Sequence, residues 1–107
     1  MKNNNERRQF VEDINNWEMT ESTIWTQTFR LTYGDVEWYQ FRILENTYHY
    51  DPETHTDEYK PEWTNHSRYY RFFDDGNRCY LEPYSKSNII EEISVIDKKL
   101  KEKGEQK

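Results

Sequence analysis

The sequence predicts an α+β fold, an antiparallel sheet of about four strands flanked by an N-terminal and a C-terminal helix. Apolar residues recur at helical spacing only near the two ends of the chain, and the segment between them is rich in aromatic and β-branched residues with glycine-containing turns. We expect a single domain over residues 1–107, with frayed ends at residues 1–5 and 101–107.

Both predicted helices carry an apolar stripe. The N-terminal helix covers residues 4–18, and its stripe consists of Phe10, Val11, Ile14 and Trp17. The C-terminal helix has Ser87 or Asn88 as its N-cap and is expected to end at Gly104. Its stripe consists of Ile89, Ile93, Ile96 and Leu100. Residues 20–23 are poor helix formers and separate the first helix from the strands.

Two hairpins are predicted between the helices. The first joins residues 23–33 to residues 36–45 through Gly34-Asp35, and the second joins residues 67–73 to residues 78–81 through a turn at residues 74–77. A two-residue loop at Gly34 would pair Leu31 with Trp38 and leave both sheet faces apolar. A shift by one residue gathers the apolar side chains on one face, so we expect a bulge near Gly34, with Trp38 pointing away from the core.

Residues 46–66 match neither a helix nor a regular strand. Pro52 and Pro61 interrupt the segment, and Asp51-Pro52 favours a turn. The sequence therefore predicts an irregular loop of about 20 residues, and loops of that length are usually functional or disordered. Its Tyr and Trp residues argue against simple disorder. Two alternatives stay open for this segment: a binding loop, or a solvated charge run whose aromatic residues fold back over the sheet.

Composition limits the possible partners and compartment. The net charge of −6 and the pI of about 5.1 oppose direct binding to nucleic acid or to an anionic membrane, and no apolar run is long enough to span a bilayer. A single cysteine, Cys79, predicts a structural thiol in a reducing, cytoplasmic compartment. The abundance of Asn and Lys and the lack of Ala indicate an AT-rich genome, such as that of a low-GC bacterium or its phages.

Neither catalysis nor a cofactor is expected. The chain has only three glycines and no phosphate-binding loop, and no spacing positions a nucleophile beside a base. His49-x-Asp51, His55-x-Asp57 and His66 offer ligand types that suit zinc or iron, but their spacing matches no metal motif. The sequence therefore predicts neither an enzyme nor a metal site.

The aromatic inventory indicates binding. Nine Tyr, five Phe and four Trp outnumber the 17 Val, Ile, Leu, Met and Cys, and a domain of this size cannot bury them all. Eight carboxylates lie between Asp35 and Glu62, with only Arg42 and Lys60 as cations. We expect the partner-binding residues to be Trp38, Tyr48, Tyr50, Asp51, Glu53, Asp57, Glu58, Tyr59, Glu62 and Trp63.

These features predict a non-catalytic protein-binding module, a small acidic inhibitor that occupies the basic nucleic-acid-binding surface of a partner such as a nuclease. Phage and mobile-element anti-defence proteins, including anti-CRISPR proteins and DNA mimics, have this size and composition. An immunity protein that neutralises a toxin nuclease would share the same features. A third alternative is an RNA- or ligand-binding accessory domain that uses Arg68, Tyr70, Arg71 and Tyr80 on the sheet. A fourth is a structural subunit that buries its aromatic residues by self-association.

Overall fold

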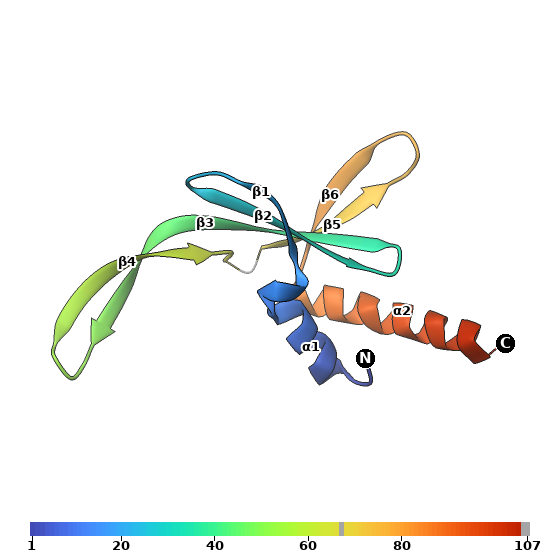
Figure 1. The fold of residues 1–107 in the computed structure, drawn as a ribbon, viewed down its shortest axis with the longest axis horizontal. Helices are drawn as coiled ribbons and strands as arrows, with labels where there is room; N and C mark the ends of the chain where they lie inside the picture. The colour runs from blue at the N-terminus through green and yellow to red at the C-terminus, as the bar shows by residue number, and fades with distance from the viewer. Residues whose placement is uncertain (67, 106–107) are drawn as a thin grey trace.

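The computed structural model describes residues 1–66 and 68–105. In this part the chain forms two α-helices and one antiparallel sheet whose strands differ in length (Figure 1). The elements follow the order α1 (Asn4–Glu12), η1 (Ile14–Asn16), β1 (Glu18–Ser22), β2 (Thr26–Tyr33), β3 (Val36–Asp51), β4 (Thr56–Thr64), β5 (Tyr69–Asp74), β6 (Cys79–Tyr84) and α2 (Lys86–Glu105). The predicted α+β class and the two flanking helices are confirmed. The sheet has six strands, however, where the sequence predicted about four.

Strand β3 organises the sheet because it is long enough to pair with three neighbours. β2 pairs with residues 36–43 of β3 along one edge. Along the other edge, β5 pairs with residues 38–40 and β4 pairs with residues 43–51. β1 and β6 complete the sheet as partners of β2 and β5, which gives the order β1-β2-β3-β5-β6 with β4 beside β3.

The core lies between the sheet and the two helices, which occupy the same side of the strands (Figure 1). Its buried apolar residues are Val11, Trp17, Phe29, Leu31, Trp38, Tyr69, Ile89, Ile90 and Ile93. Trp38 is 0% exposed, and its indole Nε1 donates to Glu92 Oε1 at 3.0 Å. The sheet face that carries Leu31 and Trp38 is therefore the covered face.

The register that we expected between β2 and β3 is wrong. Tyr33 pairs with Val36 and Leu31 pairs with Trp38 across the two-residue turn Gly34-Asp35, in which Gly34 has φ +61°. The prediction assumed that the apolar side chains of both strands share one buried face. Instead Trp38 joins the core, and the apolar side chains of β3 at odd-numbered positions lie on the face opposite the helices.

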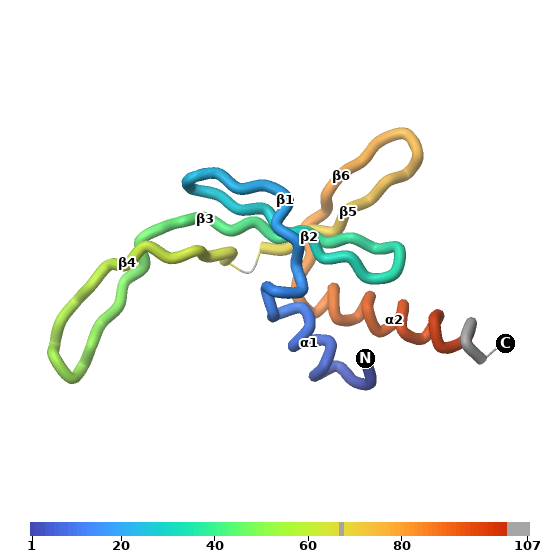
Figure 2. Tube along the Cα trace, in the orientation of Figure 1, coloured from blue at the N-terminus to red at the C-terminus, as the bar shows by residue number. Residues whose placement is uncertain are grey.

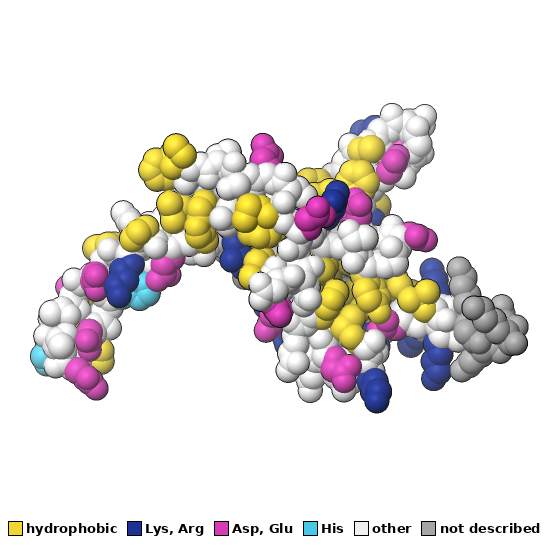
Figure 3. All heavy atoms as spheres, in the orientation of Figure 1, with side chains coloured by type: hydrophobic (Ala, Val, Ile, Leu, Met, Phe, Trp, Pro, Cys, Tyr) yellow, Lys and Arg dark blue, Asp and Glu magenta, His cyan; other side chains and the backbone are white. Residues whose placement is uncertain are grey.

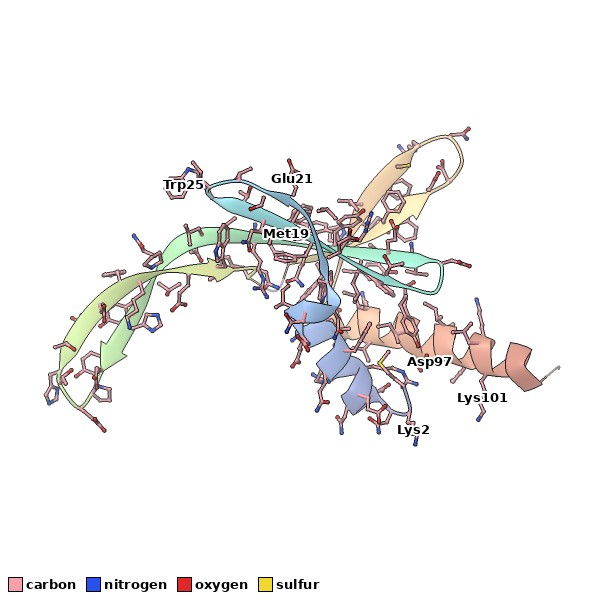
Figure 4. The ribbon with its side chains drawn as sticks, viewed as in Figure 1. Lys2, Met19, Glu21, Trp25, Asp97 and Lys101 are labelled. Atoms are coloured by element: carbon pink, nitrogen blue, oxygen red, sulfur yellow. The ribbon has the colours of Figure 1, made fainter. Side chains whose placement is uncertain are left out.

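Asp97 ties α2 to the N-terminal segment and to β2. Asp97 lies on α2, where Figure 4 labels it. Arg7 Nε donates to Asp97 Oδ2 at 2.9 Å, and the Tyr33 hydroxyl donates to Asp97 Oδ1. Partial burial raises the pKa of Asp97, but the hydrogen bonds from Tyr33 and Arg7 outweigh it and hold that pKa below its usual value. The hydrogen bond between the Tyr33 hydroxyl and Asp97, and then the partial burial of the phenol, raise the pKa of Tyr33 to about 12.

The N-terminal helix is shorter than predicted. α1 ends at Glu12, and Asp13 then accepts a hydrogen bond from Asn15 N, which starts the 3-10 turn η1. Trp17 is buried as expected, but its indole donates to the Val11 carbonyl from outside the helix. The five residues of β1 that follow are all exposed, so they lack the alternation by which a strand is recognised in sequence.

The C-terminal helix is longer than predicted. Ser85 Oγ accepts from Asn88 N, so Ser85 acts as the N-cap in place of Ser87 or Asn88. α2 continues through Gly104, where the sequence predicted its end, to Glu105. Gln106 and Lys107, and the predicted strand start at Ser67, lie outside the described residues.

The predicted irregular loop is an ordered hairpin. Residues 46–51 extend β3, Pro52 lies in the turn, and residues 56–64 form β4. Pro61 fits within β4 because, in the described part of the chain, β4 pairs with β3 on one side and with no strand on the other, and an edge strand tolerates a residue without an N–H. This hairpin extends the molecule to 63 × 36 × 19 Å, with a radius of gyration of 17.7 Å (Figure 2).

Candidate protein-interaction site

Residues 44–63 form a two-stranded projection, which we call the ribbon (Figure 1). β2 pairs with β3 as far as Ile43, and just beyond it Leu44 N donates to the Trp25 carbonyl at 2.8 Å. Among the described strands, β4 alone pairs with residues 45–51. The ribbon register runs from Leu44 opposite Trp63 to Asp51 opposite Thr56. Since side chains alternate along a strand, this register sorts the ribbon residues into two faces.

The first face of the ribbon is aromatic. It carries Leu44, Trp63, Asn46, Pro61, Tyr48, Tyr59, Tyr50 and Asp57. The rings of Tyr48 and Tyr59, which are paired across the strands, lie 5.5 Å apart between centroids. Tyr48, Tyr50 and Tyr59 are 54%, 51% and 68% exposed, so these rings lie on the surface. Aromatic side chains of this kind anchor protein interfaces.

The second face of the ribbon is charged. It carries Glu45, Glu62, Thr47, Lys60, His49, Glu58, Asp51 and Thr56. His49 Nε2 lies 2.6 Å from Glu62 Oε1, and His66 Nε2 lies 2.5 Å from Glu45 Oε1 at the base of the ribbon. His49 and His66 are therefore each engaged by a carboxylate, whereas His55 Nδ1 lies 3.0 Å from the Tyr50 hydroxyl in the turn of the ribbon.

Hydrogen bonds keep these carboxylates ionised. The hydroxyl of Thr47, and then His49, lower the pKa of Glu62. The hydroxyl of Thr64 lowers the pKa of Glu45, with His66 adding to the effect. On the aromatic face the Tyr48 hydroxyl donates to Asp57 Oδ1 at 2.6 Å, which raises the pKa of Tyr48 and keeps the phenol neutral. At neutral pH the ribbon therefore combines anionic carboxylates with neutral phenols.

Nine of the ten residues that we expected to bind a partner lie on the ribbon. Tyr48, Tyr50, Asp57, Tyr59 and Trp63 occupy the aromatic face, Asp51, Glu58 and Glu62 occupy the charged face, and Glu53 lies in the turn. Trp38 is the exception, because its side chain is buried beneath the helices. The predicted register was shifted by one residue and therefore pointed Trp38 away from the core. The prediction that Trp38 is exposed is wrong.

The two-faced arrangement was not predicted, although the sequence contains its signal. Tyr48 and Tyr50 alternate with His49 and Asp51, which is the period of a strand. The two prolines of the segment obscured this pattern. Glu45, His49 and Lys60 belong to the charged face and were absent from the predicted partner-binding set.

The arginine-aromatic set on β5 and β6 does not form one surface. Tyr70 pairs with Pro83 on the sheet face opposite the helices, whereas Arg71 and Tyr80 alternate to the face that the helices cover. The Arg71 guanidinium is held by Glu92 at 3.2 Å and lies 4.4 Å from the Phe73 ring centroid. A stacking platform for RNA would need these groups on one exposed face.

The described residues contain no group of three or more His, Cys, Asp or Glu side chains placed to hold a metal ion. Cys79 is exposed, and desolvation together with Asp74 raises the pKa of its thiol, which disfavours the reactive thiolate. No helix in the described part of the chain is long and apolar enough to cross a membrane. Comparison with protein-family models, curated proteins and solved structures found no significant match.

Proposed function

We propose that this protein is a non-catalytic protein-binding module that engages its partner through the ribbon. The observation that carries the proposal is the exposure of Tyr48, Tyr50 and Tyr59 on a projection in which residues 45–51 pair, among the described strands, with β4 alone. An aromatic ring on the surface contributes little through burial until a partner covers it, and Tyr is enriched among the residues that dominate binding energy.

The charge of the ribbon favours a basic partner. Residues 44–63 contain six carboxylates and one cation, Lys60. Complementary charge accelerates encounter and suppresses binding to other acidic surfaces. A cleft that normally binds nucleic acid is lined with cations, so the charged face would meet those cations while the aromatic face packs on the opposite wall. This arrangement supports an acidic inhibitor of a nucleic-acid-binding protein, such as a phage anti-defence protein.

Affinity capture from nuclease-treated bacterial lysates tests the proposal. An aromatic variant, Tyr48→Ser with Tyr59→Ser, and a charge variant, Glu53→Lys with Glu58→Lys, change the ribbon alone. The matched control is Glu21→Lys with Glu91→Lys, which makes the same charge change at exposed positions of the body. We expect the wild type and the control to capture the same basic protein, with about tenfold less captured by each ribbon variant.

The salt dependence separates the two faces. Capture by the aromatic variant should keep the steep salt dependence of the wild type, whereas capture by the charge variant should lose part of it. Equal capture by the control and both ribbon variants would contradict the proposal. Loss of capture only in the body control would place the binding surface outside the ribbon.

A further inference from the structure

The sheet face opposite the helices carries a second aromatic surface, which we call the open face. Its apolar side chains are Tyr39, Phe41, Ile43, Tyr70, Phe72 and Leu81. Phe41 and Tyr70 meet edge to face at 5.3 Å between centroids, and Tyr39 and Phe72 do so at 6.3 Å. Both helices lie on the other side of the strands, so within the described residues no helix packs over this surface (Figure 1).

The open face is large enough to form part of an interface. Phe41, Ile43 and Leu81 are 37%, 41% and 41% exposed, and the other three side chains are half-buried. Together the six side chains expose on the order of 400 Å² of apolar surface, which is at the scale of a functional patch. One partner in a standard interface contributes about 800 Å², and polar groups around the apolar centre would supply the remainder.

Charges of opposite sign lie at the two ends of the open face. Along β5 and the residue preceding it, positions on this face read Arg68, Tyr70, Phe72 and Asp74. Alternate residues of a strand share a face, so the Arg68 and Asp74 positions are about 20 Å apart. Arg68 lines one hollow with Phe41 and Tyr70, and Glu37 and Asp74 line another with Phe72. The open face thus has a cation at the Arg68 end and carboxylates at the Glu37 and Asp74 end. Among the described residues, the charge pair beside its aromatic centre is Arg30 with Glu18, which lie 2.6 Å apart next to Tyr39 and so offset each other.

This polarity is self-complementary. A two-fold axis in the plane of the interface and perpendicular to the strands reverses the strand direction in the second copy. The basic end of each copy then lies over the acidic end of the other, and the aromatic centres meet on the axis. The ribbon leaves the open face accessible, because it curves toward the side on which the helices lie (Figure 1).

We propose that the open face binds a second copy of this chain in antiparallel orientation, with Arg68 of each copy facing Glu37 and Asp74 of the other. Two such sheets would stack face to face at about 10 Å, as in β-sandwiches. The ribbons would project from opposite ends of the dimer. This interface uses residues outside the ribbon, so it stands or falls independently of the proposed function.

Light scattering and sedimentation equilibrium across a concentration range test this interface. We expect the wild type to dimerise reversibly, and Arg68→Glu or Glu37→Arg alone to raise the dimer dissociation constant by about tenfold or more, because like charges then meet twice. An equimolar mixture of the two variants should restore dimers. In the mixed pair the new carboxylate at position 68 faces the new guanidinium at position 37, and the other contact is native.

An apolar variant provides a second readout that does not depend on charge. Phe41→Ser should weaken the dimer, whereas Ile24→Ser, which removes a 76% exposed side chain at the β1–β2 hairpin, should leave it unchanged. Circular dichroism confirms that each variant is folded. A folded wild type that stays monomeric to about 1 mM would overturn the proposal. A dimer that is insensitive to Phe41→Ser, or a mixture of the two charge variants that fails to associate, would also overturn it. If the chain is monomeric and instead captures a different protein in a Phe41-dependent manner, that protein replaces the second copy as the occupant of the open face.

Discussion

The two halves of strand β3 have the same backbone conformation but different surroundings. In residues 36–42, Trp38 and Gln40 are buried under the helices. Residues 44–51 belong to the ribbon, which projects from the body of the protein (Figure 3). Tyr48 and Tyr50 in this half are each more than half exposed. Strand formation therefore does not determine burial here. What differs is the presence of α1 and α2 on one half, which makes the first half structural and leaves the second available for binding.

The largest expected effect is the contrast between Trp38→Ala and Tyr48→Ala. Trp38→Ala leaves a cavity in the core and removes the indole hydrogen bond to Glu92, so it should cost about 4 kcal/mol of unfolding free energy. Tyr48→Ala removes an exposed ring and should cost about 1 kcal/mol or less. Urea denaturation measures both, and Trp38→Phe gives a milder value if the alanine variant does not fold. Similar costs for the two alanine variants would mean that the ribbon is covered after all.

The next largest effect concerns Asp97, which holds α2 to α1 and to β2 on the side of the sheet that the helices cover. Asp97→Asn removes the charge that Arg7 and Tyr33 engage, and we expect a loss of about 2 kcal/mol near neutral pH. Glu91→Gln, at an exposed position of the same helix, is the matched control and should change stability by less than about 0.5 kcal/mol.

The pH dependence of that effect has a defined sign. Because the native pKa of Asp97 is lowered, its stabilising contribution is complete above the unfolded value of about 4 and is lost as pH falls through the lowered native value. The difference in unfolding free energy between the wild type and Asp97→Asn should therefore shrink on acidification. A difference that stays constant between neutral and acidic pH would assign the loss to packing.

A smaller effect distinguishes two turns with positive φ. Gly34 has φ +61°, and a Cβ there would lie 3.0 Å from Ile96 Cγ2 on α2, whereas Gly76 has φ +88° with open space around it. Both alanine variants incur backbone strain of about 1 kcal/mol, and Gly34→Ala should cost about 1 kcal/mol more because Ile96 must move. Thermal or urea unfolding compares them. Equal costs would show that α2 does not restrain the β2–β3 turn.

The smallest expected effect comes from removing most of the ribbon. Replacing residues 47–60 with Asn-Gly joins Asn46 to Pro61, which already oppose each other, through a tight turn. The unfolding free energy should change by about 1 kcal/mol or less, because the deleted residues have β4 or β3 as their strand partners and the covered core stays intact. A loss of more than about 2 kcal/mol would show that the ribbon packs on the body. In hydrogen exchange, ribbon amides should exchange faster than those of residues 29–40.

Sequence reasoning found the elements with strong local signals. The stripe of α2 is confirmed at Ile89, Ile93 and Ile96, and both predicted hairpin turns occur at their glycines. It failed where tertiary context decides. The β2–β3 register depends on which apolar face the helices cover, and a sequence with two apolar sheet faces does not contain that choice. β1 is exposed along its whole length, so it shows no pattern.

The candidate site was located better than it was described. Nine of the ten predicted residues share the ribbon because aromatic and acidic residues concentrate in that segment. Its geometry was missed because Pro61 normally argues against a strand, and only the pairing with β3 shows that β4 lies at an edge. The open face was hidden for a similar reason. The expected register gathered Tyr39 and Phe41 with Leu31 on one core-facing side, and only the observed register places these two rings on the opposite face.

The length of the ribbon also affects how the molecule moves through solution. A compact chain of this size has a radius of gyration of about 13 Å, whereas this one has 17.7 Å. By the same scaling, 17.7 Å corresponds to a compact protein of roughly 240 residues, more than twice the actual length. The monomer should therefore show an elevated frictional ratio and elute from a gel-filtration column near the volume of a compact dimer. Elution volume alone would misassign its mass, and deletion of the ribbon should shift the peak further than the lost residues account for.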